Sequence, residues 1–195
     1  MTWKKNLKKF YHFLVHDNSI WSWIVNIILA FIIVKFIIFP GMGLILSTDL
    51  PMVAVVSCSM EHNIGDEDCS MGHLSFDDWW EQEQSWYLEN GIDKSAFESF
   101  KMKNGFNKGD VIILHGKDEV EVGDIVVYDS GAHTYPIIHR VTLINEGENT
   151  VVVKGDNNDS PDPYDVNLDG IRGTALYKIP YVGWVKIWFT SLIGG

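Results

Sequence analysis

Hydrophobic and polar positions divide the chain into one long apolar run and a region of shorter apolar segments. Residues 20–40 read IWSWIVNIILAFIIVKFIIFP and contain a single charge, Lys35. About 20 apolar residues in a helix cross the hydrocarbon core of a bilayer, whereas the apolar part of a cleavable signal peptide is shorter. The run therefore predicts an uncleaved transmembrane helix at 20–40, preceded by a basic segment at 1–19.

After a Gly- and Pro-containing linker at 41–51, the apolar runs become short and rich in β-branched residues. Runs of this kind between turn residues are typical of strands, and Gly-Asp pairs separate several of them. The pattern predicts a mainly β domain over 41–180, built as a curved sheet or partial barrel. Its strands are expected at 52–58, 111–115, 125–128, 136–144, 150–154 and 171–179.

Residues 63–106 break this pattern, because they contain ten acidic residues and few β-branched ones. Ser75 can cap a helix that Gly91 can end, and a second short helix is expected from Asp93. The apolar stripe of the longer helix would consist of Phe76, Trp79, Trp80 and Tyr87. We expect a helical insertion folded over the sheet; a lid or a partner-binding surface is the alternative.

Residues 181–195 are apolar and aromatic but too short to cross a bilayer. Trp184 and Trp188 lie one helical turn apart, which suits a helix that faces a membrane surface. We expect a short membrane-interfacial segment here, with a core segment as the alternative.

The charge is unevenly distributed along the chain. Residues 1–40 hold five lysines against one aspartate, whereas the remainder holds ten basic and 25 acidic residues. Because basic flanks stay on the cytoplasmic side, we expect a cytoplasmic N-terminus and a β domain outside the cytoplasm. The acidic balance of that domain excludes nucleic-acid binding, which needs a basic footprint. Outside the cytoplasm Cys58 and Cys69 can pair; two free thiols are the alternative.

Three short segments carry the residue types that serine-based peptide hydrolysis requires. A serine hydroxyl becomes a strong nucleophile when a base takes its proton and a third group orients that base. The segments are SCSMEH at 57–62, PIIHRV at 136–141 and KGDNNDSPDPYD at 154–165. Each alone has an ordinary structural explanation: a strand-end serine, a core histidine and an aspartate-rich loop.

The residues alone leave several alternatives open. Either Asp156 or Asp162 could orient the base. The alternatives to His139 as the general base are four histidines and two lysines: His62, His73, His115, His133, Lys108 and Lys154. A membrane-tethered binding module without activity is the non-enzyme alternative.

Taken together and in this order, the segments resemble the signal peptidase I family in its archaeal and endoplasmic-reticulum form. SCSMEH resembles the family's Ser-x-Ser-Met-Glu-Pro box. VGDIVVYDSGAHTYPIIHRV resembles its Gly-Asp strand and the later His-Arg-Val, and KGDNNDSPD resembles its Lys-Gly-Asp-Asn-Asn box. The resemblance covers about 41–60 and 107–190.

The resemblance implies a role for five residues. Ser59 would be the nucleophile, His139 the general base and Asp162 the triad acid. Asp156 would be a supporting carboxylate, and the Ser57 hydroxyl would help the oxyanion hole.

The resemblance also implies a membrane-bound serine endopeptidase that cleaves signal peptides from secreted preproteins after small residues at positions −1 and −3. Its expected partners are preprotein signal peptides and the lipid bilayer, with the protein-export channel as a further candidate. The expected location is the cell membrane, and no cofactor or metal is implied. A specialised or inactive relative with restricted substrates or a binding role is the alternative.

Two features depart from the family pattern. His62 stands where the family has proline, which changes the geometry after the nucleophile. The insertion at 63–106 separates two boxes that are normally close. We expect this insertion to be dispensable for folding of the β core but to influence substrate choice.

Two groups of metal-ligand types are weak candidates. Asp165, Asn167 and Asp169 resemble the start of an EF-hand loop, but its twelfth position is Leu176 instead of glutamate. The second group lacks a recognisable zinc spacing and consists of His62, Asp66, Asp68, Cys69 and His73.

Overall fold

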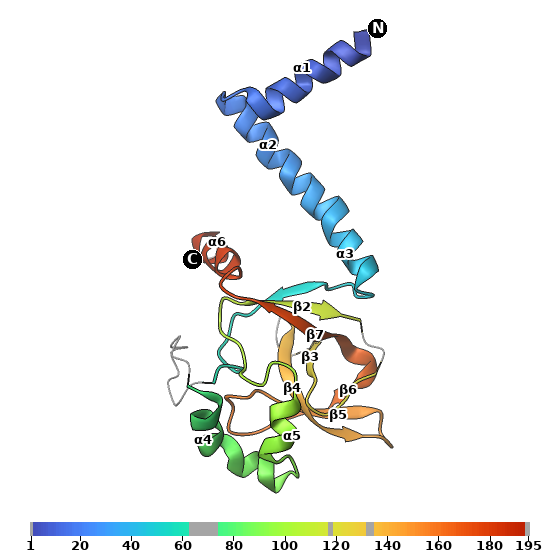
Figure 1. Cartoon of the computed structure of the whole chain (residues 1–195). Coiled ribbons are helices and arrows are strands. Elements are labelled where there is room, and N and C mark those ends of the chain that lie inside the picture. The colour runs from blue at the N-terminus through green and yellow to red at the C-terminus, as the bar shows by residue number, and fades with distance from the viewer. Residues whose placement is uncertain (1, 63–73, 117–118, 132–134, 194–195) are drawn as a thin grey trace. The chain divides into compact units, whose positions relative to one another are not determined.

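The computed structural model describes residues 2–62, 74–116, 119–131 and 135–193 (Figure 1). The chain forms two compact units: a helical one, Met1–Ile45, and a larger one, Leu46–Gly195, built around a β-sheet. The expectations that concern Asp66, Asp68, Cys69, His73 and His133 fall outside the described residues.

The helical unit consists of α1 (Thr2–His16), α2 (Ile20–Ile33), the π-helical turn η1 (Val34–Ile38) and α3 (Phe39–Ile45). Ser19 caps α2, because its side chain accepts a hydrogen bond from the Ser22 N–H. Ser22 in turn donates to the Phe13 carbonyl at 2.6 Å, and Asn26 donates to the Leu14 carbonyl at 2.8 Å. These bonds satisfy carbonyls that the end of α1 leaves without intrahelical donors.

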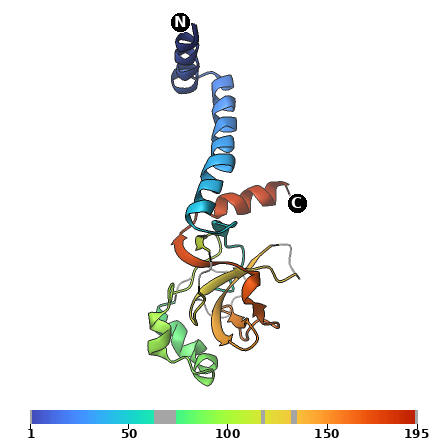
Figure 2. The same ribbon diagram turned by 90° about the vertical axis from the view of Figure 1, so that its right-hand side faces the viewer.

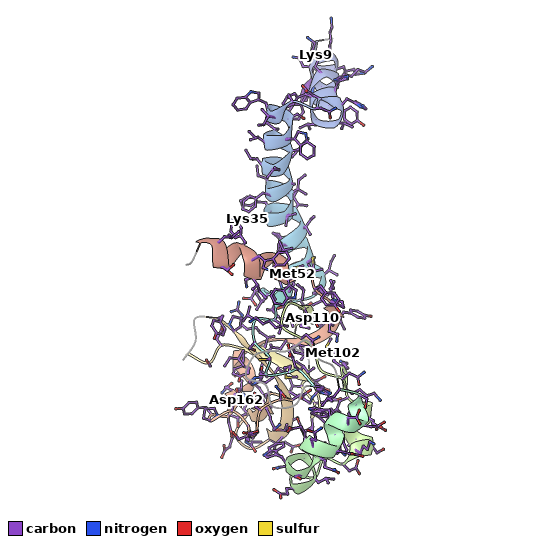
Figure 3. All side chains as sticks on the ribbon, turned by 90° about the vertical axis from the view of Figure 1, so that its left-hand side faces the viewer. Lys9, Lys35, Met52, Met102, Asp110 and Asp162 are labelled. Atoms are coloured by element: carbon purple, nitrogen blue, oxygen red, sulfur yellow. The ribbon has the colours of Figure 1, made fainter. Side chains whose placement is uncertain are left out.

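One helix, Ile20–Ile45, is long and apolar enough to cross a membrane, with a mean hydropathy of 2.5. Figure 3 shows its side chains, Lys35 among them, projecting outward around the helix. The helix runs past the predicted end at Pro40, so the first part of the expected linker at 41–51 is helical. The π-helical turn directly before Pro40, in which the Phe39 N–H bonds to the Val34 carbonyl, accommodates a residue with no N–H to donate.

The larger unit contains one seven-stranded antiparallel sheet in the order β1-β2-β7-β3-β4-β5-β6. The strands are β1 (Met52–Ala54), β2 (Val111–His115), β3 (Ile125–Tyr128), β4 (Ile137–Asn145), β5 (Thr150–Lys154), β6 (Val166–Asn167) and β7 (Ile171–Ile179). The 3₁₀ turn η2 (Leu168–Gly170) joins the last two. The sheet curls into a half-barrel, which confirms the predicted mainly β fold (Figures 1 and 2).

Strand β3 shows why the sheet is apolar on both sides. Successive side chains of a strand point to opposite faces. Ile125 and Val127 belong to one buried cluster, and Val126 and Tyr128 belong to another. The sheet therefore carries a core on each face, and its strands read as continuous apolar runs.

The strands differ from the prediction at two points. Strand β1 ends at Ala54, although Val55 still exchanges backbone hydrogen bonds with Gly109 and Asp110, directly before β2. Residues 56–58 of the expected strand thus leave the ladder. Strand β6 has two residues, too few for a periodic signal, and has no counterpart among the predicted strands.

The described part of the insertion is helical, as predicted. It contains α4 (Phe76–Glu89) and α5 (Lys94–Ser99), whose N-caps are Ser75 and Asp93. Gly91 follows α4 with a φ of +79°, a conformation that suits glycine after a helix. The two helices enclose a third buried cluster, formed by Trp79, Trp80, Tyr87, Ile92 and Phe97.

The last helix of the larger unit is α6 (Trp184–Ile193). Its first residue packs against Gly109, where a Cβ atom would lie only 2.0 Å from Trp184 Nε1. Figures 1 and 2 place α6 at the end of the unit remote from α4 and α5. Its large apolar side chains are mainly exposed: Val185, Trp188, Phe189 and Leu192.

Candidate active site

Ser59 lies in a short stretch, residues 57–62, that follows the edge strand β1; we call it the Ser59 segment. Backbone N–H groups from two later parts of the chain donate hydrogen bonds to it. The Asn157 N–H donates to the Ser59 carbonyl at 2.8 Å, and the Phe106 N–H donates to the Met60 carbonyl at 2.9 Å. Both partners come from loops that follow other elements, so the segment is fixed by tertiary contacts.

The Ser59 hydroxyl is half-buried and lies 3.3 Å from the hydroxyl of exposed Ser57. Cys58, between them, is disulfide-bonded, and the chain's other cysteine falls outside the described residues. Ser59 and His139 are both described, and no hydrogen bond joins them in this structure. Catalytic hydrogen bonds often tighten only when substrate binds.

His139 projects from β4 and is buried, with 7% of its surface exposed. Its Nδ1 atom lies 2.8 Å from Asp162 Oδ1. The contact is an ion-pair contact that does not meet hydrogen-bond geometry. Asp162 is anchored by its own N–H, which donates to the Val153 carbonyl of β5. Asp162, labelled in Figure 3, thus meets the histidine from a loop fixed to the neighbouring strand.

Tyr128, at the end of β3, donates a hydrogen bond from its hydroxyl to Asp162 Oδ2. Burial alone would raise the pKa of Asp162, but the contacts with His139 and Tyr128 outweigh burial and lower it. Burial and the same carboxylate raise the pKa of Tyr128, so the phenol stays protonated as the donor. Asp162 is therefore an ionised carboxylate beside His139.

Asp156 is fully buried and does not contact His139 among the described interactions. Arg140 binds it through two bonds, Nε to Oδ1 at 2.8 Å and Nη2 to Oδ2 at 2.7 Å. His62 Nε2 lies 3.1 Å from Oδ2. Burial would raise the pKa of Asp156, but Arg140 and His62 hold it well below its ordinary range.

The loop after Asp156 borders an open hollow of about 470 Å³ lined by residues 157–163. Asp162 lies on its wall, and the same loop contacts Ser59 through Asn157. The loop therefore connects the Ser59 segment with the His139–Asp162 pair. This arrangement can orient a histidine and keep a carboxylate ionised, with open space beside that carboxylate.

The alternative bases lie in other settings. His115 Nδ1 contacts the Gly116 carbonyl at 2.6 Å. Lys154 is buried and lies over the rings of Tyr87 and Trp86, at 4.8 and 5.4 Å from their centroids. Its amino group is thus held among aromatic rings, and burial lowers the pKa of Lys154.

The EF-hand-like aspartates accept hydrogen bonds from the β4–β5 hairpin. Asp165 accepts a hydrogen bond from Asn145 at 2.8 Å, and Asp169 accepts one from Asn149 at 3.4 Å. Asn167 caps η2 by accepting from the Asp169 N–H. Within the described ranges, no group of three or more His, Cys, Asp or Glu side chains gathers so that it could hold a metal ion.

Two contacts of the site have no counterpart in the sequence predictions. Tyr128 ends a predicted strand, and a tyrosine there is ordinary for a sheet, so its bond to Asp162 had no separate signal. His62 was visible as a departure from the family box, but its partner Asp156 lies 94 residues away. Both contacts depend on how β3, β4 and β5 are packed, which spacing alone does not encode.

Comparison with known proteins identifies the family of this chain. No family model matches it. The chain is 30% identical over 163 residues to the signal peptidase complex catalytic subunit sec11 of Schizosaccharomyces pombe, covering 78% of this chain and 74% of that one. It is 35% identical over 100 residues to SEC11 of Lodderomyces elongisporus, covering 46% of this chain and 60% of that one.

A third relative, SEC11 of Plasmodium falciparum, is 28% identical over 103 residues, covering 48% of this chain and 56% of that one. The chain thus spans between about half and three quarters of the length of these relatives. All three are named as catalytic subunits of a signal peptidase complex. The identity to the fission yeast subunit extends over most of both chains, and the chain therefore belongs to the signal peptidase I family in its archaeal and endoplasmic-reticulum form.

Proposed function

We propose that this chain is a membrane-bound serine endopeptidase that removes signal peptides from secreted preproteins. The observation that carries the proposal is the His139–Asp162 contact at 2.8 Å, joined through the 155–162 loop to the segment that holds Ser59. A serine, a buried histidine and an ionised carboxylate are the three groups that serine-based acyl transfer needs. The test is Ser59-dependent cleavage of a preprotein.

In the proposed reaction, Ser59 Oγ attacks the scissile carbonyl carbon while His139 takes the hydroxyl proton. The C–N bond breaks, and the leaving amine receives that proton from His139. Water then attacks the acyl carbon while His139 accepts a proton from it, the ester C–O bond breaks, and His139 returns this proton to Ser59 Oγ as the new carboxyl end leaves. Asp162 orients the imidazole and stabilises the imidazolium formed in each half-reaction.

The negative oxygen of the tetrahedral intermediate needs donors aimed at it. We assign this role to the Ser59 N–H and the Ser57 hydroxyl, because the two serine hydroxyls lie 3.3 Å apart. Asp156 has a different part: its bonds to Arg140 and His62 place it inside the domain, where it fixes the turn that leads to Asp162.

Substrates on this proposal are preproteins with small residues at positions −1 and −3, bound as an extended strand. The named relatives belong to signal peptidase complexes, and we propose that this chain likewise works on signal peptides in the bilayer, with the protein-export channel as a further partner. The exposed apolar side chains of α6 suit contact with the bilayer interface.

The membrane orientation gives a first prediction. We expect residues 1–19 in the cytoplasm and the β domain outside it, because four lysines of α1 precede the candidate span Ile20–Ile45. In right-side-out cells, added protease should therefore degrade the β domain. Activity of a reporter that is fused after Gly195 and functions only in the cytoplasm would contradict this orientation.

A lysine-based enzyme is the alternative that Lys154 keeps open, because burial lowers the pKa of its ammonium. We expect Lys154→Met to keep most of the cleavage rate, because methionine can fill the space under Trp86 and Tyr87. The measurement is kcat on a preprotein, with circular dichroism to check folding. A folded Lys154→Met variant without activity would favour the lysine base over His139.

A further inference from the structure

A cluster of buried charged and polar side chains lies under the aromatic rings of the insertion. Arg140, His62 and Lys154 surround Asp156, and each of the four is at most 2% exposed. An aromatic ring of the insertion covers each of the three basic side chains. Trp79 covers His62, Phe97 covers Arg140 at 4.8 Å, and Tyr87 covers Lys154 at 4.8 Å.

This cover gives a physical reason why the β core would need the insertion, against the expectation that the insertion is dispensable; a deletion of residues 66–104 would decide between them. The guanidinium of Arg140 is fully buried, and besides Asp156 it donates to the carbonyls of Lys101 and Met102, which follow α5. Removing the insertion would remove these acceptors and uncover the charges. The aromatic rings of the insertion form a cluster of their own, and that cluster also covers the buried charged side chains of the β domain.

His62 is the point at which this cover reaches the Ser59 segment. Its ring lies parallel to that of Trp79, with centroids 3.7 Å apart and an angle of 9°. Its Nε2 lies 3.1 Å from Asp156 Oδ2. Because Asp156 is ionised and can only accept, Nε2 carries the proton and donates it. Among the residues that the structure describes, Nδ1 is then a buried acceptor without a hydrogen-bond partner.

Four hydrogen bonds connect the Ser59 segment to one turn, residues 155–157. Three of them act on residues 58–60: the Asn157 N–H donates to the Ser59 carbonyl, the Asn157 side-chain amide donates to the Cys58 carbonyl, and the Asp156 N–H donates to Met60 Sδ. The fourth, from the His62 side chain to Asp156, holds the far end of the segment against the same turn. With both parts of the segment held, its direction is fixed, and this direction determines where the Ser59 hydroxyl points.

We propose that His62, clamped between Trp79 and Asp156, is a positioning residue for Ser59, and that holding this clamp is a catalytic task of the insertion. The inference rests on the proposed function for its activity readout. It gives a task to two residues outside the Ser-His-Asp set: His62, which stands where the family box has proline, and Trp79 of the insertion.

Simple packing would not explain the choice of residue. An apolar ring could stack on Trp79 equally well and would leave no buried acceptor, whereas an unsatisfied buried polar atom costs about 1–3 kcal/mol. Histidine adds one thing that such a ring lacks, the hydrogen bond to Asp156. That bond is the feature to be tested.

The experiment compares matched variants of the full chain in detergent or liposomes. His62→Phe keeps the ring and loses the donor, whereas His62→Gln keeps a donor near Nε2 and loses the ring. We expect His62→Phe to lower kcat between about tenfold and 100-fold with little change in KM, as for a misplaced nucleophile. His62→Gln should recover most of that loss.

Trp79→Leu and Trp80→Leu form the second matched pair. Both remove an indole from the same buried cluster, but only Trp79 contacts the His62 ring. We expect both to lower the melting temperature similarly, and only Trp79→Leu to lower kcat. Equal kcat losses in the two variants, or an unchanged kcat in His62→Phe, would overturn the proposal.

Amide hydrogen exchange separates this inference from the proposed function. We expect His62→Phe and Trp79→Leu to speed exchange at Glu61 and Asn157, whose N–H groups bond within the Ser59 segment or to it, and Trp80→Leu to leave it unchanged. If wild type showed no Ser59-dependent cleavage, the proposed function would fail, and this exchange pattern would still decide whether the clamp holds the segment. Unchanged exchange in all variants would refute the clamp.

The clamp also has a pH signature. Burial outweighs the attraction of Asp156 and lowers the pKa of His62, with Arg140 and Lys178 acting in the same direction. The unfolded chain therefore takes up the proton first, and stability falls as the pH drops below about 6.5. The fall in melting temperature between pH 7 and 5 should be smaller in His62→Gln. An equal fall in wild type and variant would contradict a buried neutral His62.

Discussion

Ser59→Ala and His139→Ala are each expected to lose cleavage of a preprotein by a factor on the order of 10⁶ in kcat. Without the hydroxyl there is no nucleophile, and without the imidazole nothing takes its proton. Because the two groups act as one unit, the double variant should lose little beyond either single variant. Single-turnover rates of purified variants in detergent give all three values.

Ser59 is half-buried and His139 carries no structural ion pair other than that with Asp162 among the described contacts. Both alanine variants should therefore keep the wild-type circular dichroism spectrum, which serves as the control. Turnover retained in Ser59→Ala, after exclusion of a contaminating protease, would end the proposed mechanism. Additive losses in the double variant would show that the two residues act separately.

Asp162→Asn and Asp156→Asn are expected to fail in opposite ways. Asp162 faces the imidazole, so its loss should lower kcat by a factor on the order of 10⁴, as expected when the base is no longer oriented. It is partly exposed at the rim of the hollow, and its side chain has Tyr128 and His139 as partners. The melting temperature of Asp162→Asn should therefore change little.

Asp156→Asn leaves the buried guanidinium of Arg140 without its counter-charge. Removing one partner of a buried ion pair costs about 3–5 kcal/mol, which corresponds to a fall in melting temperature of roughly 10 °C for a domain of this size. Activity should fall as well, because the turn that carries Asn157 and leads to Asp162 loses its anchor.

The comparison needs kcat and melting temperature for both asparagine variants under one condition. The pH dependence gives a further check, because the lowered pKa of Asp156 adds stability that is complete above pH 4 or so and is lost as the pH falls further. Asp156→Asn should lack that loss. A fully stable, inactive Asp156→Asn beside an active Asp162→Asn would exchange the two assignments.

Local signals in the sequence account for most of the fold. β-branched runs predict five strands close to their observed bounds, and Ser75 and Asp93 predict the starts of α4 and α5. These signals succeed because capping and strand formation depend on neighbouring residues. They miss the helical continuation through Pro40, because the π-helical turn that accommodates it has no compositional signature.

The candidate site was predictable to a lesser extent. The ordered boxes indicate Ser59, His139 and the two aspartates through their resemblance to a family. They assign the acid role to Asp162 only through its match to the family box, since the residues alone leave Asp156 and Asp162 as alternatives in one loop. The distinction comes from β4, which carries His139 and Arg140 as neighbours with different partners. His139 contacts Asp162 at the rim of the hollow, whereas Arg140 binds the buried Asp156.

The insertion shows the limit of composition as a guide. Its acidic, aromatic sequence reads as a separate helical element, and in its described part it has its own core. Its contacts with His62, Arg140 and Lys154 are long-range, and no periodicity announces them. Only the folded structure shows that an added element closes the charged interior beside Ser59.

The most direct test of the central claim is the product made by the purified chain in liposomes. A preprotein with a defined signal peptide is added during reconstitution, and the mass of each fragment is measured. We expect one cut, after a small residue at −1 with another at −3, in wild type and none in Ser59→Ala. A preprotein left intact by wild type under conditions in which an endoplasmic-reticulum signal peptidase complex cleaves it, or a cut that persists in Ser59→Ala, would contradict the account.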